Sequence, residues 1–342
     1  MPGNPRWQQR PEGSNWGEFG ADDECGRLNL LTREKVLQGI AEVKEGVTFN
    51  LSLPLDLPGG NKLQPRRHPP KLRPTEKNGV QYFVHPYAHD YPGCSDVVCD
   101  DAVLLHLQYS TQWDSLAHVG SMFDADGDGE PEPVFYNGWR GGVDIVRPRL
   151  AAEEFRGAGR LGIQNMAERC IQGRAVMIDL HHHFGNARKV VDYDDLMRVM
   201  EADRVVVERG DMVCLHTGFA QVVLDMKGDP DAHTLHSVCP VLKGLDERLL
   251  QWITDSGLAV LIADNYAVED RIQKMPDGYR GPYIPLHQHC LFKLGVHLGE
   301  IWYLTELARW LRAHGRNRFL LTAPPLRLPG AVGSPVNPVA TV

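Results

Sequence analysis

The chain has 342 residues, of which 42% are hydrophobic, and its formal net charge at pH 7 is −8. This length and composition allow a substantial core, while the acidic balance argues against a nucleic-acid surface, which is normally basic. Seven scattered cysteines, no apolar run long enough for a bilayer and a polar N-terminus predict a cytoplasmic protein with reduced thiols and no membrane partner.

Local patterns in the first part of the chain predict a helix, a strand and a loop. Thr32 can cap a helix whose apolar face includes Leu37 and Ile40, and residues 47–53 alternate like a strand. A basic stretch rich in proline and glycine near 54–77 is expected to be a long loop.

In the second part, apolar strand-like runs alternate with amphipathic helices. Strands are expected at 174–180, 212–216, 258–263 and 318–322, with helices following Asp192 and at 247–254 and 303–313. Strands that alternate with helices indicate an α/β fold.

The segment from Gln108 to His118, which reads QYSTQWDSLAH, is the richest in side chains that could do chemistry. It follows a strand-like run at 102–107, and on an extended backbone alternate side chains share a face. Gln108, Gln112 and Asp114 would then point the same way, and one helical turn would bring His118 back beside Asp114. An imidazole, a carboxylate and two amides predict a metal site or an acid–base site.

This segment resembles the signature His-x-Gly-Thr-His-x-Asp-x-Pro-x-His of the cyclase family, metal-dependent hydrolases that include bacterial kynurenine formamidases and isatin hydrolases. Thr111, Asp114 and His118 match the signature. Gln108 and Gln112 stand where the family has two metal-binding histidines, so the chain looks like a variant branch.

Further matches to that branch lie along most of the chain. They are Asn15 to Gly17, Gly26 to Leu31, Phe135 to Gly138, Ala263 to Asn265 with Glu269, Leu286-His287 with Gly299-Glu300, and Gly333 to Pro338. The resemblance implies a swivelling β/β/α domain with a mixed sheet over residues 1–342, with an N-terminal extension. It also implies a homodimer or homotetramer.

The resemblance further implies that His287 and Glu300 complete a metal centre with Asp114. Gln112 is the fourth candidate ligand, and His289 competes with His287 if that segment is extended. This mixture of nitrogen and oxygen donors suits Zn²⁺ or Mn²⁺. We expect a single or weakly held ion, because an amide binds zinc less well than the imidazole it replaces.

Three functions fit these residues. The first is a hydrolase that opens an amide, imide or lactone by metal-activated water, with His118 as the proton shuttle. If Gln112 leaves a coordination gap, His118 could instead be a ligand. The second is a metal-free or weakly metallated lyase or cyclase in which Asp114 and His118 act as acid and base. The third is a non-catalytic binder of small molecules.

Aromatic side chains suggest a pocket for a small planar substrate. Trp113 and Tyr136, together with Gln108, are predicted to contact it. His106, on the predicted face of Gln108, is a candidate replacement for a missing metal ligand.

Overall fold

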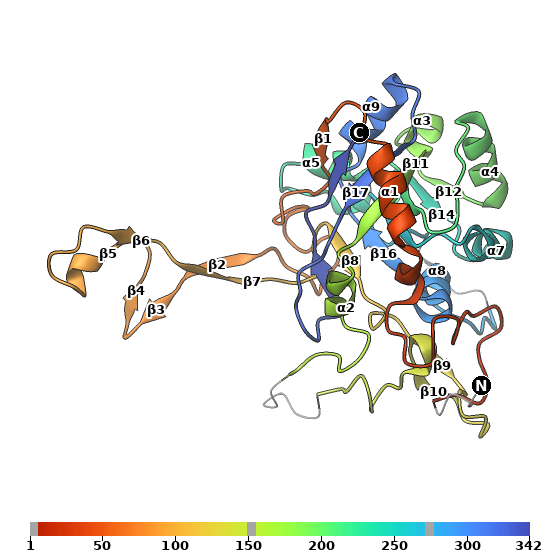
Figure 1. Ribbon diagram of the computed structural model, residues 1–342, viewed down its shortest axis with the longest axis horizontal. Helices are drawn as coiled ribbons and strands as arrows, with labels where there is room; N and C mark the ends of the chain where they lie inside the picture. Colours follow the sequence, from red (N-terminus) through yellow and green to blue (C-terminus); the bar gives the residue numbers. More distant parts are fainter. Residues whose placement is uncertain (1–5, 149–154, 271–276) are drawn as a thin grey trace.

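The computed structural model describes residues 6–148, 155–270 and 277–342, and its centre is a nine-stranded mixed sheet (Figure 1). The middle strands are parallel, and antiparallel strands extend the sheet on both sides. From edge to edge the strands are β1 (Thr48–Asn50), β19 (Val339–Thr341), β17 (Arg318–Thr322), β11 (Gln172–Asp179), β13 (Met212–His216), β15 (Val260–Ala263), β16 (His297–Glu300), β8 (Gln112–Asp114) and β18 (Gly333–Pro335). The predicted α/β class with a mixed sheet is confirmed.

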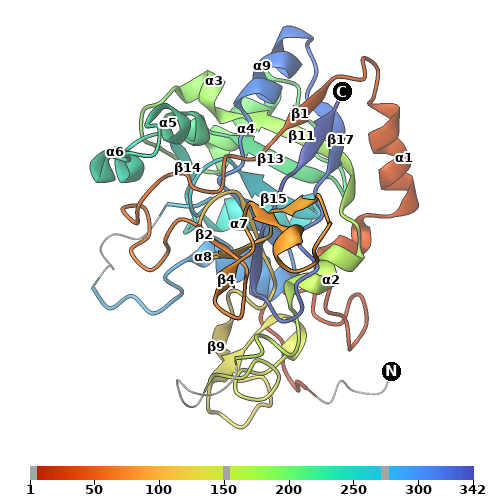
Figure 2. The ribbon, with the colours of Figure 1, turned by 90° about the vertical axis from the view of Figure 1, so that its left-hand side faces the viewer.

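Helices cover both faces of this sheet (Figures 1 and 2). The helices with their bounds are α1 (Arg33–Ala41), α2 (Ile163–Glu168), α3 (Leu180–Phe184), α4 (Tyr193–Ala202), α5 (Phe219–Asp225), α6 (Ala232–Ser237), α7 (Glu247–Ser256), α8 (Pro285–His287), α9 (Thr305–Ala313), the 3₁₀ turns η1 (Gly26–Leu30), η2 (Tyr87–His89) and η3 (Tyr136–Gly138), and the π-helical η4 (Gln288–Leu294). Side chains of α4, α7 and η4 pack in one core cluster, and those of α2 and α9 pack in the other. Central strands buried on both faces explain the continuous apolar runs in the sequence.

Most predicted elements of the sheet and its helices are confirmed. Asp192 caps α4 by accepting a hydrogen bond from the backbone N–H of Asp195, and Thr32 likewise caps α1. All seven cysteines are free thiols. Within the described ranges, no helix has the length and apolar character needed to cross a bilayer.

The predicted apolar face of α1 is wrong. Leu37 and Ile40 are about half exposed, whereas Lys35 and Gly39 face the sheet. Gly39 allows a close approach, since a Cβ there would lie 2.7 Å from a backbone carbonyl carbon of β11. The Lys35 ammonium reaches over the sheet to the buried carboxylate of Asp211, at 2.9 Å. The ion pair of Lys35 with Asp211 and the close backbone contact at Gly39 therefore hold α1 against the sheet.

Residues 71–104 form an arm that projects from the body (Figure 1) and is seen end-on in Figure 2. It consists of three antiparallel pairs, β2 (Lys71–Pro74) with β7 (Asp101–Leu104), β3 (Glu76–Lys77) with β4 (Val80–Gln81), and β5 (His85–Pro86) with β6 (Val97–Val98). The prediction of a plain loop at 54–77 is therefore wrong for its last part, and the strand predicted at 102–107 belongs to the arm. Two further pairs lie in the body, β9 (Ser121–Phe123) with β10 (Glu132–Val134), and β12 (Lys189–Val191) with β14 (Pro240–Leu242).

Candidate functional site

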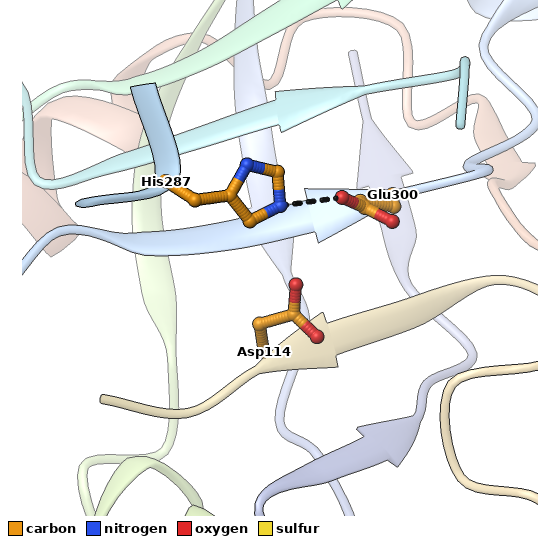
Figure 3. Close-up of side chains that lie close together, drawn as sticks. All are labelled: Asp114, His287 and Glu300. Atoms are coloured by element: carbon orange, nitrogen blue, oxygen red, sulfur yellow. Dashed lines mark hydrogen bonds and ion pairs between the residues drawn. The ribbon is translucent and has the colours of Figure 1, made fainter. Parts of the chain in front are cut away.

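Asp114, His287 and Glu300 lie together, with potential ligand atoms all within 4.8 Å of one another (Figure 3). Asp114 ends β8, Glu300 ends β16, and His287 ends the short helix α8. β8 and β16 are antiparallel neighbours in which Glu300 lies opposite Gln112. Because opposed and alternate residues share a face, the side chains of Gln112, Asp114 and Glu300 converge.

Glu269, which the sequence analysis did not assign to the site, holds His287 in place. It accepts the backbone N–H groups of Leu286 and His287, each at 2.9 Å, and its Oε1 lies 2.7 Å from Nδ1 of His287. The other ring nitrogen, Nε2, faces the cluster at 3.1 Å from Oε1 of Glu300. A carboxylate behind a histidine fixes the tautomer and the orientation of the ring, which is the usual support of a metal-binding imidazole.

The three side chains differ in their hydrogen bonds: His287 bonds to Glu300, whereas the carboxylate of Asp114 accepts no hydrogen bond. Burial opposes protonation of His287, but hydrogen bonds to Glu269 and Glu300 outweigh it and raise the pKa of His287 to about 10. Burial likewise opposes ionisation of Glu300, yet the hydrogen bond and charge of His287 lower the pKa of Glu300. For Asp114 burial dominates and raises the pKa, with His118 opposing it in part.

At this site the polar atoms without a hydrogen-bond partner lie on Asp114 and Gln112. Both carboxylate oxygens of Asp114 and Oε1 of Gln112 are buried and accept no hydrogen bond from any described residue. A buried carboxylate without a partner is costly, and a divalent cation held with His287 and Glu300 would remove that cost. Two carboxylates, an imidazole and an amide oxygen are donors that Zn²⁺ and Mn²⁺ accept. The residues present therefore fit a metal ion.

His118 lies at the border between this cluster and solvent. It follows β8 in a turn, and its Nε2 is 3.8 Å from Oδ1 of Asp114. Its side chain is 23% exposed, whereas that of Asp114 is buried. An imidazole in this position can exchange protons with water while it stays next to the buried carboxylate.

Comparison with known proteins identifies the family. The profile described as "Putative cyclase" matches residues 49–270, more than half of the chain. The chain belongs to the cyclase family. The crystal structure of a novel cyclase superposes on it with a TM-score of 0.74 and 29% identity, covering 98% of this chain and 100% of that chain.

Isatin hydrolases share the fold of this cyclase-family chain. Isatin hydrolase A from Ralstonia solanacearum superposes with a TM-score of 0.54 and 14% identity, covering 86% of this chain and 91% of its own. Isatin hydrolase A from Labrenzia aggregata, bound to benzyl benzoate, gives 0.54 and 12%, with coverages of 90% and 97%. At such low identities the likeness concerns the fold alone. No curated protein matches the chain.

Gln108 reaches the cluster side of the sheet by a route that the sequence analysis did not predict. In the cyclase-family chain, Gly333 of β18 directly opposes Asp114, so a side chain at 333 would share the face of Asp114. An ideal Cβ on Gly333 would lie 2.5 Å from Nε2 of Gln108. The amide of Gln108 therefore occupies the space that the glycine leaves open.

Trp113 and Tyr136, both predicted to contact substrate, lie in the core instead. Alternation along β8 turns Trp113 to the opposite face of the sheet, where its ring packs on Trp302 with centroids 4.9 Å apart. The N–H of Trp113 donates to the backbone oxygen of Ala323. Tyr136 is fully buried in the other core cluster and packs against Gly295.

Two of the alternative histidine ligands, His289 and His106, are not brought to the cluster. His289 lies on the π-helical turn η4 and not on an extended segment, so it does not share the direction of His287; its Nε2 is 2.9 Å from the hydroxyl of Thr254. Burial lowers the pKa of His289 to about 4. His106 lies at the base of the arm beside His68, because the chain turns between β7 and β8.

Metal binding to this cyclase-family protein should weaken as the pH falls. His287, with a pKa of about 10, is protonated at neutral pH, so a metal must displace the proton from Nε2. The apparent affinity for Zn²⁺ should therefore fall roughly tenfold for each pH unit below the pKa of His287. Calorimetric titration in buffers of different ionisation enthalpy measures the released proton. Affinity independent of pH, with no proton released, would contradict this prediction.

Proposed function

We propose that this protein is a metal-dependent hydrolase that opens an amide, imide or lactone bond of a small cyclic or aromatic substrate. The buried carboxylate of Asp114, which accepts no hydrogen bond beside His287 and Glu300, carries this proposal. These three side chains, with Oε1 of Gln112 as a further donor, would hold one Zn²⁺ or Mn²⁺ ion. When bound, such an ion supplies Lewis-acid activation of water and polarises a carbonyl group.

Protein side chains supply the proton transfers and the orientation. His118 takes a proton from the attacking water and delivers it to the leaving nitrogen or oxygen, so one imidazole serves as base and then as acid. Asp114, whose Oδ1 lies 3.8 Å from Nε2 of His118, would orient the imidazole for these two transfers. Gln108, on the same side of the sheet, would hydrogen-bond substrate in this proposal.

Replacing His118 with Gln separates metal binding from catalysis. The variant should retain its metal, because His118 lies outside the three-residue cluster, while kcat falls by roughly 100-fold to 10,000-fold. Metal content and hydrolysis of cyclic imides, lactones and aryl formamides by the loaded enzyme provide the two measurements. His233→Gln, an exposed histidine on α6, is the matched control. An unchanged kcat in His118→Gln would refute the proton-shuttle role.

A metal-free lyase or cyclase is the second candidate, and one observation favours it. Both oxygens of Glu300 already have partners in the protein, Gln112 at 3.2 Å and His287 at 3.1 Å. Asp114 and His118 would then act alone as acid and base. Full activity after exhaustive chelation would select this candidate, whereas activity lost on chelation and restored by Zn²⁺ or Mn²⁺ would select the hydrolase.

A further inference from the structure

The segment 66–73, which leads from the body into the arm, is basic although the chain as a whole has a net charge of −8. Its permanent cations are Arg66, Arg67, Lys71 and Arg73, and none of them forms an ion pair with a described residue. Arg67 is half-buried, whereas the other three are exposed. Cations that are not neutralised by carboxylates raise the local concentration of anions. This part of the surface therefore favours an anionic ligand.

Arg67 is held beside the metal cluster by contacts on both sides of its turn. Its Nη1 donates to the backbone oxygen of Gln108 at 2.6 Å, and its backbone N–H donates to the backbone oxygen of Gln64 at 2.9 Å. The side-chain amide of Gln64 in turn donates to the hydroxyl of Tyr266 at 3.0 Å. A side chain that is fixed before a ligand arrives loses less conformational freedom on binding.

The guanidinium of Arg67 acts on Asp114 and Glu300 but bonds to neither. Burial is the largest influence on the pKa of both carboxyl groups and favours their neutral forms, and the positive charge of Arg67 opposes this effect in each. A guanidinium has five N–H donors, and Nη1 is the one nitrogen of this group that donates to a described residue. Donors on the remaining nitrogens are therefore available to a ligand.

We propose that the substrate of this protein carries a carboxylate group, and that Arg67 binds this group while the scissile bond lies at the metal cluster. This inference deepens the proposed function and rests on it for the position of the substrate. The planar fork of a guanidinium matches the two oxygens of a carboxylate. One half-buried cation suits a monoanion, whereas a phosphate dianion would call for a second.

The charges around the cluster agree with an anionic substrate. A divalent ion would offset the two negative charges of Asp114 and Glu300. The carboxylate of Glu269 bonds to Nδ1 of His287, on the side of the ring that faces away from Glu300. The charge of Arg67 is then left for a ligand that enters from the base of the arm.

Binding of small acids and of their neutral amides tests this site without any need for turnover. Benzoate and phenylacetate are compared with benzamide and phenylacetamide by ligand-observed NMR on the metal-free full chain, so that no probe can bind to a metal ion. The unaltered protein should prefer the acids. Arg67→Gln should weaken binding of the acids by roughly 10-fold to 100-fold and that of the amides by less than about twofold, because it removes only a charge and its hydrogen bonds.

Two further variants sharpen this comparison. Arg67→Lys keeps the charge and a donor for Gln108 but lacks the planar fork, so its affinity for the acids should lie between those of the unaltered protein and Arg67→Gln. Arg33→Gln, an exposed arginine at the start of α1, is the matched control and should bind like the unaltered protein. Acids that bind no better than amides, or that bind equally well to Arg67→Gln, would overturn the proposal.

Kinetics separate a failure of this inference from a failure of the hydrolase function. With 4-formamidobenzoate and its methyl ester, KM should be about tenfold lower for the acid, and Arg67→Gln should remove this difference. Hydrolysis of both compounds with equal KM would overturn the carboxylate site alone. Acid binding that depends on Arg67 in a protein that takes up no metal would support the carboxylate site and contradict the metal-dependent hydrolase.

Discussion

Replacing Asp114 with Asn should abolish metal-dependent activity and, at the same time, stabilise the metal-free protein. The two side-chain oxygens of buried Asp114 accept no hydrogen bond from any described residue, and burial raises the pKa of Asp114. An amide, unlike a carboxylate, carries no charge that burial would have to desolvate. We expect the free energy of unfolding of the metal-free protein to rise by about 1–3 kcal/mol. Metal affinity and kcat/KM should fall more than about 100-fold, because a ligand is lost.

Two measurements distinguish these opposite effects of Asp114→Asn. Urea unfolding of chelator-treated proteins gives the stability difference, and titration with Zn²⁺ or Mn²⁺ gives the affinity. Asp255→Asn, an exposed residue on α7 outside both acidic clusters, is the matched control and should change neither quantity. A variant that is less stable without metal and binds metal normally would show that the carboxylate has a structural role only.

Elements of the sheet could be predicted because local sequence patterns indicate which of their residues are buried. The run at 258–263 is apolar throughout and forms β15, and the cap at Asp192 begins α4. The strands of the arm lack such a pattern, because those at 71–74 and 101–104 are exposed on both sides and show no apolar alternation. Only the strand-like run at 102–107 was predicted, whereas the stretch around 71–74, rich in proline and charge, looks like a loop.

The candidate site was only partly predictable for a similar reason. The motif indicated Asp114, His287 and Glu300, and these side chains do converge. Glu269 was missed because its partners come from α8, which tertiary folding places beside it. Trp113 was misplaced because the strand that carries Asp114 is buried on both faces, so an aromatic neighbour packs in the opposite core.

Glu269→Gln should weaken metal binding by about 10-fold to 100-fold without unfolding the protein. Gln keeps the shape of the side chain and an acceptor for the backbone N–H groups of Leu286 and His287, but it removes the charge behind the ring. That charge stabilises a positive His287 whether Nε2 carries a proton or a metal. The negative charge of Glu269 stabilises a divalent ion bound at Nε2 more than it stabilises a proton there. Removing this charge therefore favours the metal-free state.

The pH profile distinguishes this electrostatic role of Glu269 from a purely structural one. Without the charge of Glu269 the pKa of His287 should fall below about 10, because the hydrogen bond to Glu269 is the strongest influence that raises it. The pH at which metal affinity levels off should therefore move down in Glu269→Gln but not in Glu247→Gln, an exposed control on α7. Zn²⁺ titrations over a range of pH measure both shifts. An unchanged affinity with an unchanged profile would mean that Glu269 only holds the backbone of α8, because a carboxylate that orients a metal-binding imidazole must also influence its proton.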